Sequence, residues 1–528
     1  MKQKVFFILA LLLFGVTQGV EAQTHVSKLK MGTADAEKWT VSPNPAEEGQ
    51  TVTVKYTGRK KVMGVQAEKN PYTDLSMVDC AGNERQSQWT ANCYMVHTAG
   101  KYRLPLIYGN AIKNGEANTS AYTGTDNWRC TQTFPNHEGN AINAPWITKS
   151  PNEKGANRGM GISVASAELL WQDAKGLVTE VGIKGDYLTL TVGKNATEQE
   201  GNAVVAAKTA DGTIVWSWHI WVTRQTFAEA DLATFNTGKH IYKLTPVNVG
   251  WVGDRVSAGY SPYFQWGRKD AFIPADLTKL ETAGGESIGG GGGGGIGVGG
   301  WTTPQTIYAA NLVVYDINDN EVKGIETELN DEATVADNIK NPTTIYRNVN
   351  LNGDYDFHEL CTPNQNPALN WWNAQQQDLE ANSDIDLNAG SDITVNIATA
   401  TVKTVFDPCP AGFCVPTNNL FVYFESLEGK ALTIEESIPG RTLTDGESSV
   451  FFPFIGYRYN TDKVTRVSDV DKAYYASSTC ISSTEYFSYY RAFDFQISLL
   501  DKDPSSADPY YNILECCFAL PVRAVVEE

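Results

Sequence analysis

Two groups of tryptophans have the spacing of a platform that stacks against sugar rings. Trp216, Trp218 and Trp221 fall within one apolar segment, and Trp371 and Trp372 are adjacent. Flat aromatic side chains are typical of the walls of ligand sites. Large aromatics also dominate buried cores, so a buried sheet core is the alternative interpretation of the first group. Both interpretations stay open from the sequence.

A second set of residues has the spacing of a calcium loop. Oxygen-bearing side chains occupy positions 1, 3, 5, 7, 9 and 12 of the stretch, and Gly353 occupies the sharp turn at position 6. These side chains belong to Asn348, Asn350, Asn352, Asp354, Asp356 and Glu359. Position 1 is Asn rather than Asp, and no helices are evident on either side, so a solvated turn is the alternative. Calcium is the only cofactor that the residues suggest.

The cysteines offer redox or disulfide chemistry. The chain has nine, so at least one has no partner within it. Cys409/Cys414 and Cys80/Cys93 are the local pairs that we consider for disulfides, because an exported chain meets an oxidising environment. Buried free thiols are the alternative.

No constellation of catalytic residues stands out in the sequence. It contains no HExxH motif and no clustered histidines. His219 is isolated in an expected strand, where a hydrogen-bonded structural role is the simpler interpretation. We therefore expect a protein that is not an enzyme.

The elements around these residues can be placed from local patterns. Segments 203–208 and 213–222 are expected strands, joined at Asp211-Gly212, a strong hairpin signal. The stretch 407–417 reads DPCPAGFCVPT, and its three prolines predict a rigid turn. A helix is expected over 418–427, with apolar side chains on one face from Leu420, Phe421 and Phe424.

Charge and the first residues indicate the compartment. The formal net charge is −19, so we expect no nucleic-acid partner. Lys2 and Lys4 precede an apolar run over 5–16, and small residues stand at the cleavage positions before Gln23. This pattern predicts a Sec-type signal peptide over 1–22, and no later run is long enough for a transmembrane segment. We expect a cell-surface, outer-membrane-associated or extracellular location, with the periplasm as the alternative.

The expected fold is mainly β and divided into several domains. A small Ig-like β segment is predicted over 35–70, where Val52, Val54 and Tyr56 alternate with polar residues. A β-rich domain is predicted over 88–225, and a C-terminal module over 240–528. The Gly-rich stretch 284–300 is interpreted as a flexible insertion within that module.

Four motifs of the C-terminal half occur in the order seen in a large group of bacterial surface proteins. They are SPYFQWGRKDAF (261–272), DPCPAGFCVPT (407–417), YYASST (474–479) and PVRAV (521–525). This part resembles the Fibrobacter succinogenes major paralogous domain and the related modules of fimbrillin-family proteins. Tyr475, Ala476, Ala524 and Cys414 depart from the usual family residues. The segment from Thr90 to Thr223 resembles the domain that commonly precedes this module.

The resemblance implies a mixed α+β, C-type-lectin-like module whose two ends pair. It also implies a non-catalytic surface or fimbria-associated protein that acts in adhesion or surface assembly, with other surface or fimbrial proteins as partners. The family carries no established set of catalytic residues. A carbohydrate-binding protein of a polysaccharide-capture system, with host or environmental glycans as ligands, is the alternative.

Overall fold

The computed structural model describes the larger part of the chain. The described residues are 22–26, 39–42, 50–56, 71–123, 126–127, 130–131, 134–148, 159–238, 240–255, 259–283, 306–323, 326–329, 334–349, 356–357, 371–374, 400–427, 432–433, 440–461, 464–468, 470, 472–482, 488–495, 509–515 and 518–528. The chain forms two compact units, Met1–Pro71 and Tyr72–Glu528. The predicted signal peptide and the Gly-rich stretch 284–300 lie outside the described residues.

The first unit contains a three-stranded antiparallel sheet. Strands β1 (Ala22–Val26) and β2 (Trp39–Ser42) pair with opposite edges of the central strand β3 (Gln50–Tyr56). The strand that the alternation of Val52, Val54 and Tyr56 predicts is therefore present.

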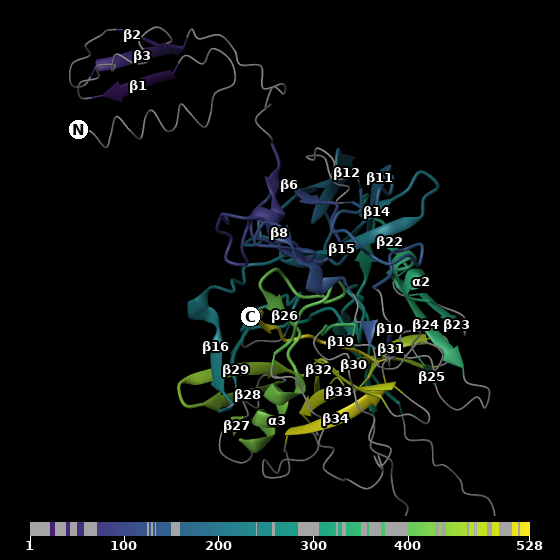
Figure 1. Cartoon of the computed structure of the whole chain (residues 1–528). Helices are drawn as coiled ribbons and strands as arrows, with labels where there is room; N and C mark the ends of the chain where they lie inside the picture. The colour runs from purple at the N-terminus through teal and green to yellow at the C-terminus, as the bar shows by residue number, and fades with distance from the viewer. Residues whose placement is uncertain are drawn as a thin grey trace, which may run out of the picture. The chain divides into compact units, whose positions relative to one another are not determined.

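Two sheets built mainly from the first half of the second unit share one hydrophobic core (Figure 1). The larger sheet has the order β22-β21-β11-β14-β15-β5, and the smaller has the order β12-β13-β6-β4. Their strands are β4 (Thr73–Asp74), β5 (Cys93–Val96), β6 (Gly100–Pro105), β11 (Ser166–Gln172), β12 (Val178–Lys184), β13 (Tyr187–Val192), β14 (Gly201–Lys208), β15 (Ile214–Val222), β21 (Val314–Tyr315) and β22 (Glu321–Val322).

Local sequence explains the centre of the larger sheet. β14 and β15 form the predicted antiparallel hairpin, and Gly212 adopts the positive φ of 91° that favours glycine in such a turn. The turn at Thr98-Ala99-Gly100 has a different role. It carries the chain from β5, which pairs with β15 in the larger sheet, to β6, which pairs with β13 in the smaller one.

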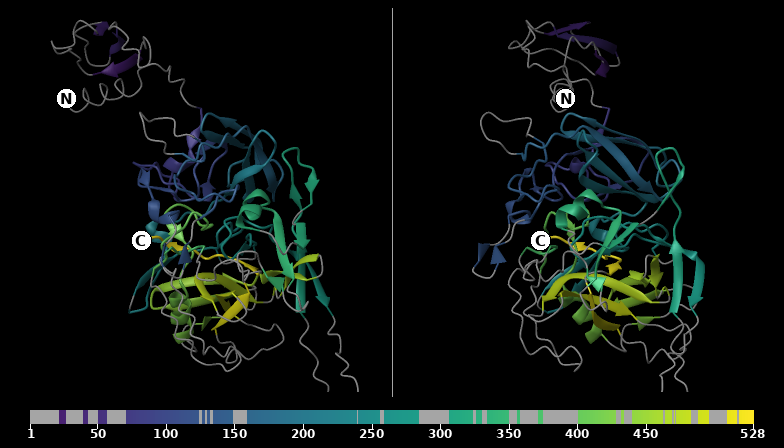
Figure 2. Two further views of the ribbon diagram at one scale, coloured as in Figure 1. Left: turned by 45° about the vertical axis from the view of Figure 1, so that its right-hand side comes forward. Right: turned by 90° about the vertical axis from the view of Figure 1, so that its right-hand side faces the viewer.

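The second half of this unit holds further sheets, drawn in teal to yellow and lying mostly below the larger sheet in Figure 1 and in both views of Figure 2. One sheet has the order β16-β17-β36-β26, and a six-stranded one has the order β18-β35-β30-β31-β20-β19. Their strands are β16 (Ala233–Asn236), β17 (Ile241–Leu244), β36 (Val525–Val526), β26 (Phe413–Cys414), β18 (Phe264–Gln265), β35 (Ala519–Leu520), β30 (Tyr457–Thr461), β31 (Val464–Ser468), β20 (Thr306–Asn311) and β19 (Ala275–Ala283).

Three smaller sheets complete this half. Their orders are β23-β24-β25, β27-β28-β29 and β32-β33-β34. The strands are β23 (Glu326–Leu329), β24 (Thr344–Val349), β25 (Asp356–Phe357), β27 (Leu432–Thr433), β28 (Gly440–Asp445), β29 (Ser448–Pro453), β32 (Ala473–Ser482), β33 (Ser488–Phe495) and β34 (Pro509–Glu515). Short elements elsewhere are β7 (Ile112–Lys113), β8 (Glu116–Ala117), β9 (Asp126–Asn127), β10 (Cys130–Thr131) and the 3-10 turns Leu75–Met77, Thr119–Ala121 and Glu229–Asp231.

Helices are few in the described part of the chain, which is therefore mainly β. The short helix α2 (Val335–Lys340) begins with a capping box between Thr334 and Asp337. Helix α3 (Asn418–Ser426) follows the proline-rich turn, as predicted. Its residues Leu420, Phe421 and Phe424 are all fully buried, which confirms the predicted apolar face.

The two predicted domains over 88–225 and 240–528 are parts of one unit rather than separate bodies. Strand β21 adds to the larger sheet by pairing Tyr315 with Gln172 of β11. The start and the end of the predicted C-terminal module also meet, because Leu244 pairs with Val525. The Gly-rich stretch connects β19 and β20, which are antiparallel neighbours, so it interrupts one hairpin of that module.

No described helix combines the length and the apolar character that a membrane crossing needs.

Candidate functional site

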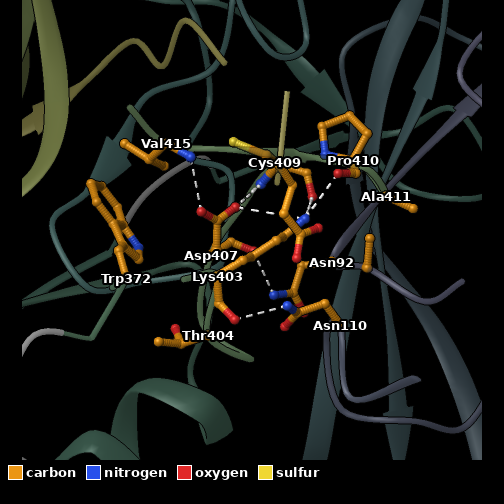
Figure 3. Close-up of polar contacts among 12 residues, drawn as sticks. Asn92, Asn110, Trp372, Lys403, Thr404, Asp407, Cys409, Pro410, Ala411 and Val415 are labelled. Atoms are coloured by element: carbon orange, nitrogen blue, oxygen red, sulfur yellow. Dashed lines mark hydrogen bonds and ion pairs between the residues drawn. The ribbon is translucent and has the colours of Figure 1, made fainter. Parts of the chain in front are cut away.

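A buried ion pair lies at the start of the proline-rich turn (Figure 3). The Nζ atom of Lys403 is 3.8 Å from Oδ1 of Asp407, and neither side chain is exposed. Lys403 also donates hydrogen bonds to the carbonyl oxygens of Cys409, at 2.8 Å, and Pro410, at 2.9 Å. Burial opposes the charge of Lys403, but the nearby carboxylates of Asp407 and Glu527 outweigh it and raise its pKa. Lys403 is therefore a cation that holds backbone carbonyls in place.

The carboxylate of Asp407 closes the turn from within. It accepts the backbone N–H of Cys409 at 2.7 Å and that of Val415 at 2.9 Å. Burial is the largest influence on Asp407 and raises its pKa above the usual value, although Lys403 and these two donors act in the opposite direction. Two backbone donors that the prolines would otherwise leave unpaired in the core are satisfied in this way.

Asparagines from the first half of the unit reach this turn. Asn92 Nδ2 donates to Val405 O at 2.7 Å and to Asp407 O at 2.8 Å, while Asn110 Nδ2 donates to Lys403 O at 2.9 Å. Asn92 Oδ1 accepts the indole N–H of Trp216 at 3.0 Å. A continuous chain of hydrogen bonds therefore runs from β15 of the larger sheet to the proline-rich turn.

Gly109 allows its own backbone segment to approach the backbone of Val405 closely. Its φ is +37°, and a Cβ atom placed there would lie 2.3 Å from the carbonyl oxygen of Val405. Only a residue without a side chain fits that contact.

A second buried cluster joins β15 to the motif 261–272. Lys269 Nζ lies 2.5 Å from both Ser217 Oγ and Asp270 Oδ1, and 4.6 Å from the ring centre of Trp216. A serine beside a lysine of lowered pKa is a combination found in nucleophilic catalysis, and burial does lower the pKa of Lys269. Here Ser217 is 1% exposed and Lys269 2%, so a substrate has no access to the hydroxyl. The cluster is a structural connection.

A third buried group contains a carboxyl and a neutral imidazole. Asp173 accepts the backbone and side-chain N–H groups of Asn202 at 2.7 and 2.8 Å, and Asn202 Oδ1 lies 2.9 Å from Nε2 of His219. Burial raises the pKa of Asp173 to about 7 and lowers that of His219 to about 3. His219 is therefore the hydrogen-bonded sheet histidine that the sequence suggested.

The predicted stacking platform is contradicted by burial. Trp216, Trp218 and Trp221 are at most 1% exposed and belong to the core around β15, as the alternative interpretation had it. Trp371 and Trp372 are 3% and 0% exposed, and Trp372 donates its indole N–H to Arg268 O at 3.2 Å. Their rings pack against other aromatics and are not available to a sugar.

The four cysteines considered for disulfides are buried free thiols, so neither predicted pair is bonded in this structure. They still come close to the same turn. Cys80 Sγ lies 3.5 Å from Ala411 O, and Cys93 forms a β-bridge with Pro410, beside Cys409. Burial raises the pKa of Cys80 to about 12 and that of Cys93, Cys409 and Cys414 well above its ordinary value. In this environment the four thiols stay protonated, so we expect them to react slowly.

Most of the predicted calcium loop lies outside the described residues, including Asn350, Asn352, Asp354 and Glu359. Asn348 and Asp356 belong to strands β24 and β25, an antiparallel pair in which Asn348 is opposite Phe357 and Val349 is opposite Asp356. The loop therefore joins two strands. No group of three or more His, Cys, Asp or Glu residues in the described ranges has the geometry to hold a metal ion.

Comparisons with known proteins give no relative. No family model, curated protein or solved structure matches the chain.

The residues that matter most to these clusters carry no recognisable signal in the sequence. Asn92, Asn110, Lys403 and Asp173 belong to no motif and stand in unremarkable surroundings. A lysine and an aspartate four residues apart around a proline-rich turn were the only available signal, and that spacing is common on exposed surfaces as well.

Proposed function

We propose that this chain is an exported, non-catalytic protein of the cell surface or of fimbriae, where it serves adhesion or surface assembly. The observation that carries the proposal is the set of buried polar clusters around Lys403, Lys269 and Asp173. Their charged groups bind backbone and neighbouring side chains, and the clusters around Lys403 and Lys269 connect the two halves of one β-rich unit, which is the chemistry of a rigid scaffold.

The finer details rest on the resemblance of the motifs. It favours an Ig-like segment over 35–70, a C-type-lectin-like C-terminal module, and other surface or fimbrial proteins as partners. The predicted signal peptide supports export. The strand pairing of Leu244 with Val525 agrees with a module whose ends pair.

A gene deletion in the native host tests the proposed role. We expect the deletion to reduce attachment to a surface or the amount of assembled surface protein, and the intact gene supplied in trans to restore it. Attachment and assembly that are both unchanged in the deletion strain would overturn the proposal.

A further inference from the structure

The three-stranded sheet of the first unit has two chemically different faces. Residues directly opposite each other on neighbouring strands share a face, and successive residues of one strand alternate between the faces. The central strand β3 pairs Val54 with Val41 of β2 and Val52 with Thr24 of β1. The register therefore places every residue of the sheet on one face or the other.

One face carries all of the apolar residues of the mature sheet. In the chain expected after removal of residues 1–22, its positions are Thr24, Val26, Trp39, Val41, Gln50, Val52, Val54 and Tyr56. The other face has only polar positions, which are Gln23, His25, Thr40, Ser42, Thr51, Thr53 and Lys55. A sheet of this kind is stable when its apolar face packs against another element.

The rest of the first unit has little apolar sequence with which to cover that face. The described part of this unit consists of β1, β2 and β3. Segments 27–38, 43–49 and 57–70 connect or follow these strands, and 12 of their 33 residues are charged. Their large apolar residues are Leu29, Met31, Val62, Met63 and Val65. This composition does not predict a second apolar layer within the unit.

The described residues of the second unit offer no matching apolar face. Their large apolar side chains that stay exposed are Ile241, Leu280 and Val313, at 54%, 53% and 36%. These belong to β17, to β19 and to the segment that follows β20, so they are single exposed residues rather than a patch. A second copy of the first unit, by contrast, presents a face of the same composition.

Charge does not oppose the pairing of two such faces. The formally charged residue of the mature sheet is Lys55, and the register places it on the polar face, opposite Thr40. Two apolar faces can therefore meet without burying a charge, whose desolvation would oppose association.

We propose that the chain forms a two-fold symmetric homodimer through its first unit, in which the two apolar faces pack as the layers of a β-sandwich. Face-to-face packing of two sheets about 10 Å apart is common for sheets with one apolar face. Three strands of this length cover roughly 300–500 Å² per copy, which is the size class of weak interfaces, so we expect a dissociation constant in the micromolar range. The inference goes beyond the proposed surface role, which does not itself require a dimer.

Sedimentation velocity of the whole mature chain, at concentrations from about 1 to 100 µM, tests this interface. Val54→Glu places a charge at the centre of the apolar face. Thr53→Glu is the matched control, because it places the same charge on the neighbouring residue of the same strand but on the polar face. Val54→Thr is a milder variant that retains the preference for a strand while adding a hydroxyl group to the apolar face.

We expect the wild type to show a concentration-dependent equilibrium between monomer and dimer. Because a two-fold axis places each substitution in the interface twice, Val54→Glu should raise the dissociation constant about tenfold or more and Val54→Thr about threefold or more. Thr53→Glu should leave it unchanged.

Three results would each overturn the dimer. They are a wild type that stays monomeric up to about 100 µM, a dimer that both Val54 variants leave intact, and a loss of dimer in Thr53→Glu as large as in Val54→Glu. Because these measurements use purified protein in solution, their failure leaves the proposed surface role standing.

Discussion

The ammonium group of Lys403 lies 3.8 Å from the carboxylate of Asp407, four residues later in the chain, and both side chains are completely buried. Removing one partner of such a pair leaves the other charge without compensation in the core. We expect Lys403→Met to lower the free energy of unfolding by about 3–5 kcal/mol, measured by urea denaturation.

Lys208→Met is the control for that change. Lys208 pairs with Glu168 at 2.6 Å, but the two side chains are 24% and 48% exposed. Pairs at the surface contribute roughly 0–1 kcal/mol, so the control should remain close to the wild type. Equal effects of the two substitutions would show that the buried pair has no special role.

The contact of Gly109 with Val405 predicts that alanine destabilises the protein more at Gly109 than at Gly139. Gly109→Ala combines a positive φ with a backbone clash, whereas Gly139 has a φ of +81° and nothing within 4 Å of an added Cβ. Gly139→Ala should cost about 1 kcal/mol from backbone strain alone, and Gly109→Ala about 2–3 kcal/mol or more. Thermal unfolding of both variants measures the difference, and similar melting temperatures would contradict the close approach of the two segments.

Asp173 and His219 should give stability opposite dependences on pH. The pKa of Asp173 rises from 3.8 to about 7 on folding, so its contribution is complete below pH 3.8 and is lost as the pH rises toward 7. The pKa of His219 falls from 6.5 to about 3, so its contribution is present above pH 6.5 and is lost as the pH falls toward 3. The two slopes oppose each other between about pH 4 and 6.5.

Single variants separate these slopes. Relative to the wild type, Asp173→Asn should gain stability with rising pH in that window, and His219→Gln should lose it. Each slope has a limit of about 1.4 kcal/mol per pH unit. Urea denaturation across the window measures both differences, which do not depend on the titration of other groups. If both variants changed the pH slope of stability in the same direction relative to the wild type, the opposite pKa shifts of Asp173 and His219 would be refuted.

The four buried thiols predict low reactivity in the folded protein. Cys80, Cys93, Cys409 and Cys414 should resist maleimide until the protein is denatured, because burial keeps them protonated and out of reach. Peptide mapping by mass spectrometry identifies the modified positions. A disulfide-linked Cys409–Cys414 or Cys80–Cys93 peptide from the exported protein would instead support the pairs suggested by the sequence.

Elements governed by neighbouring residues could be predicted from the sequence. Asp211-Gly212 specifies its hairpin, and the prolines of 407–417 followed by Leu420, Phe421 and Phe424 specify a turn and the buried face of α3. In each case the cause lies within a few residues, either in backbone conformation or in the helical period.

The interior clusters depend on contacts that no local pattern records. Asn92 and Asp407 are 315 residues apart when they share a hydrogen bond, and β11 receives β21 across the predicted domain boundary. The tryptophans around β15 illustrate the same limit, since the same spacing serves a core or a binding platform. Only tertiary packing decides between the two.

The location of the protein tests the proposed surface role most directly. Antibody labelling and protease treatment of intact cells, followed by fractionation, distinguish an exposed protein from an enclosed one. We predict labelling and cleavage on intact cells, while a periplasmic marker in the same cells stays protected. A chain that is protected together with that marker, and that becomes accessible only when the envelope is opened, would contradict the proposal.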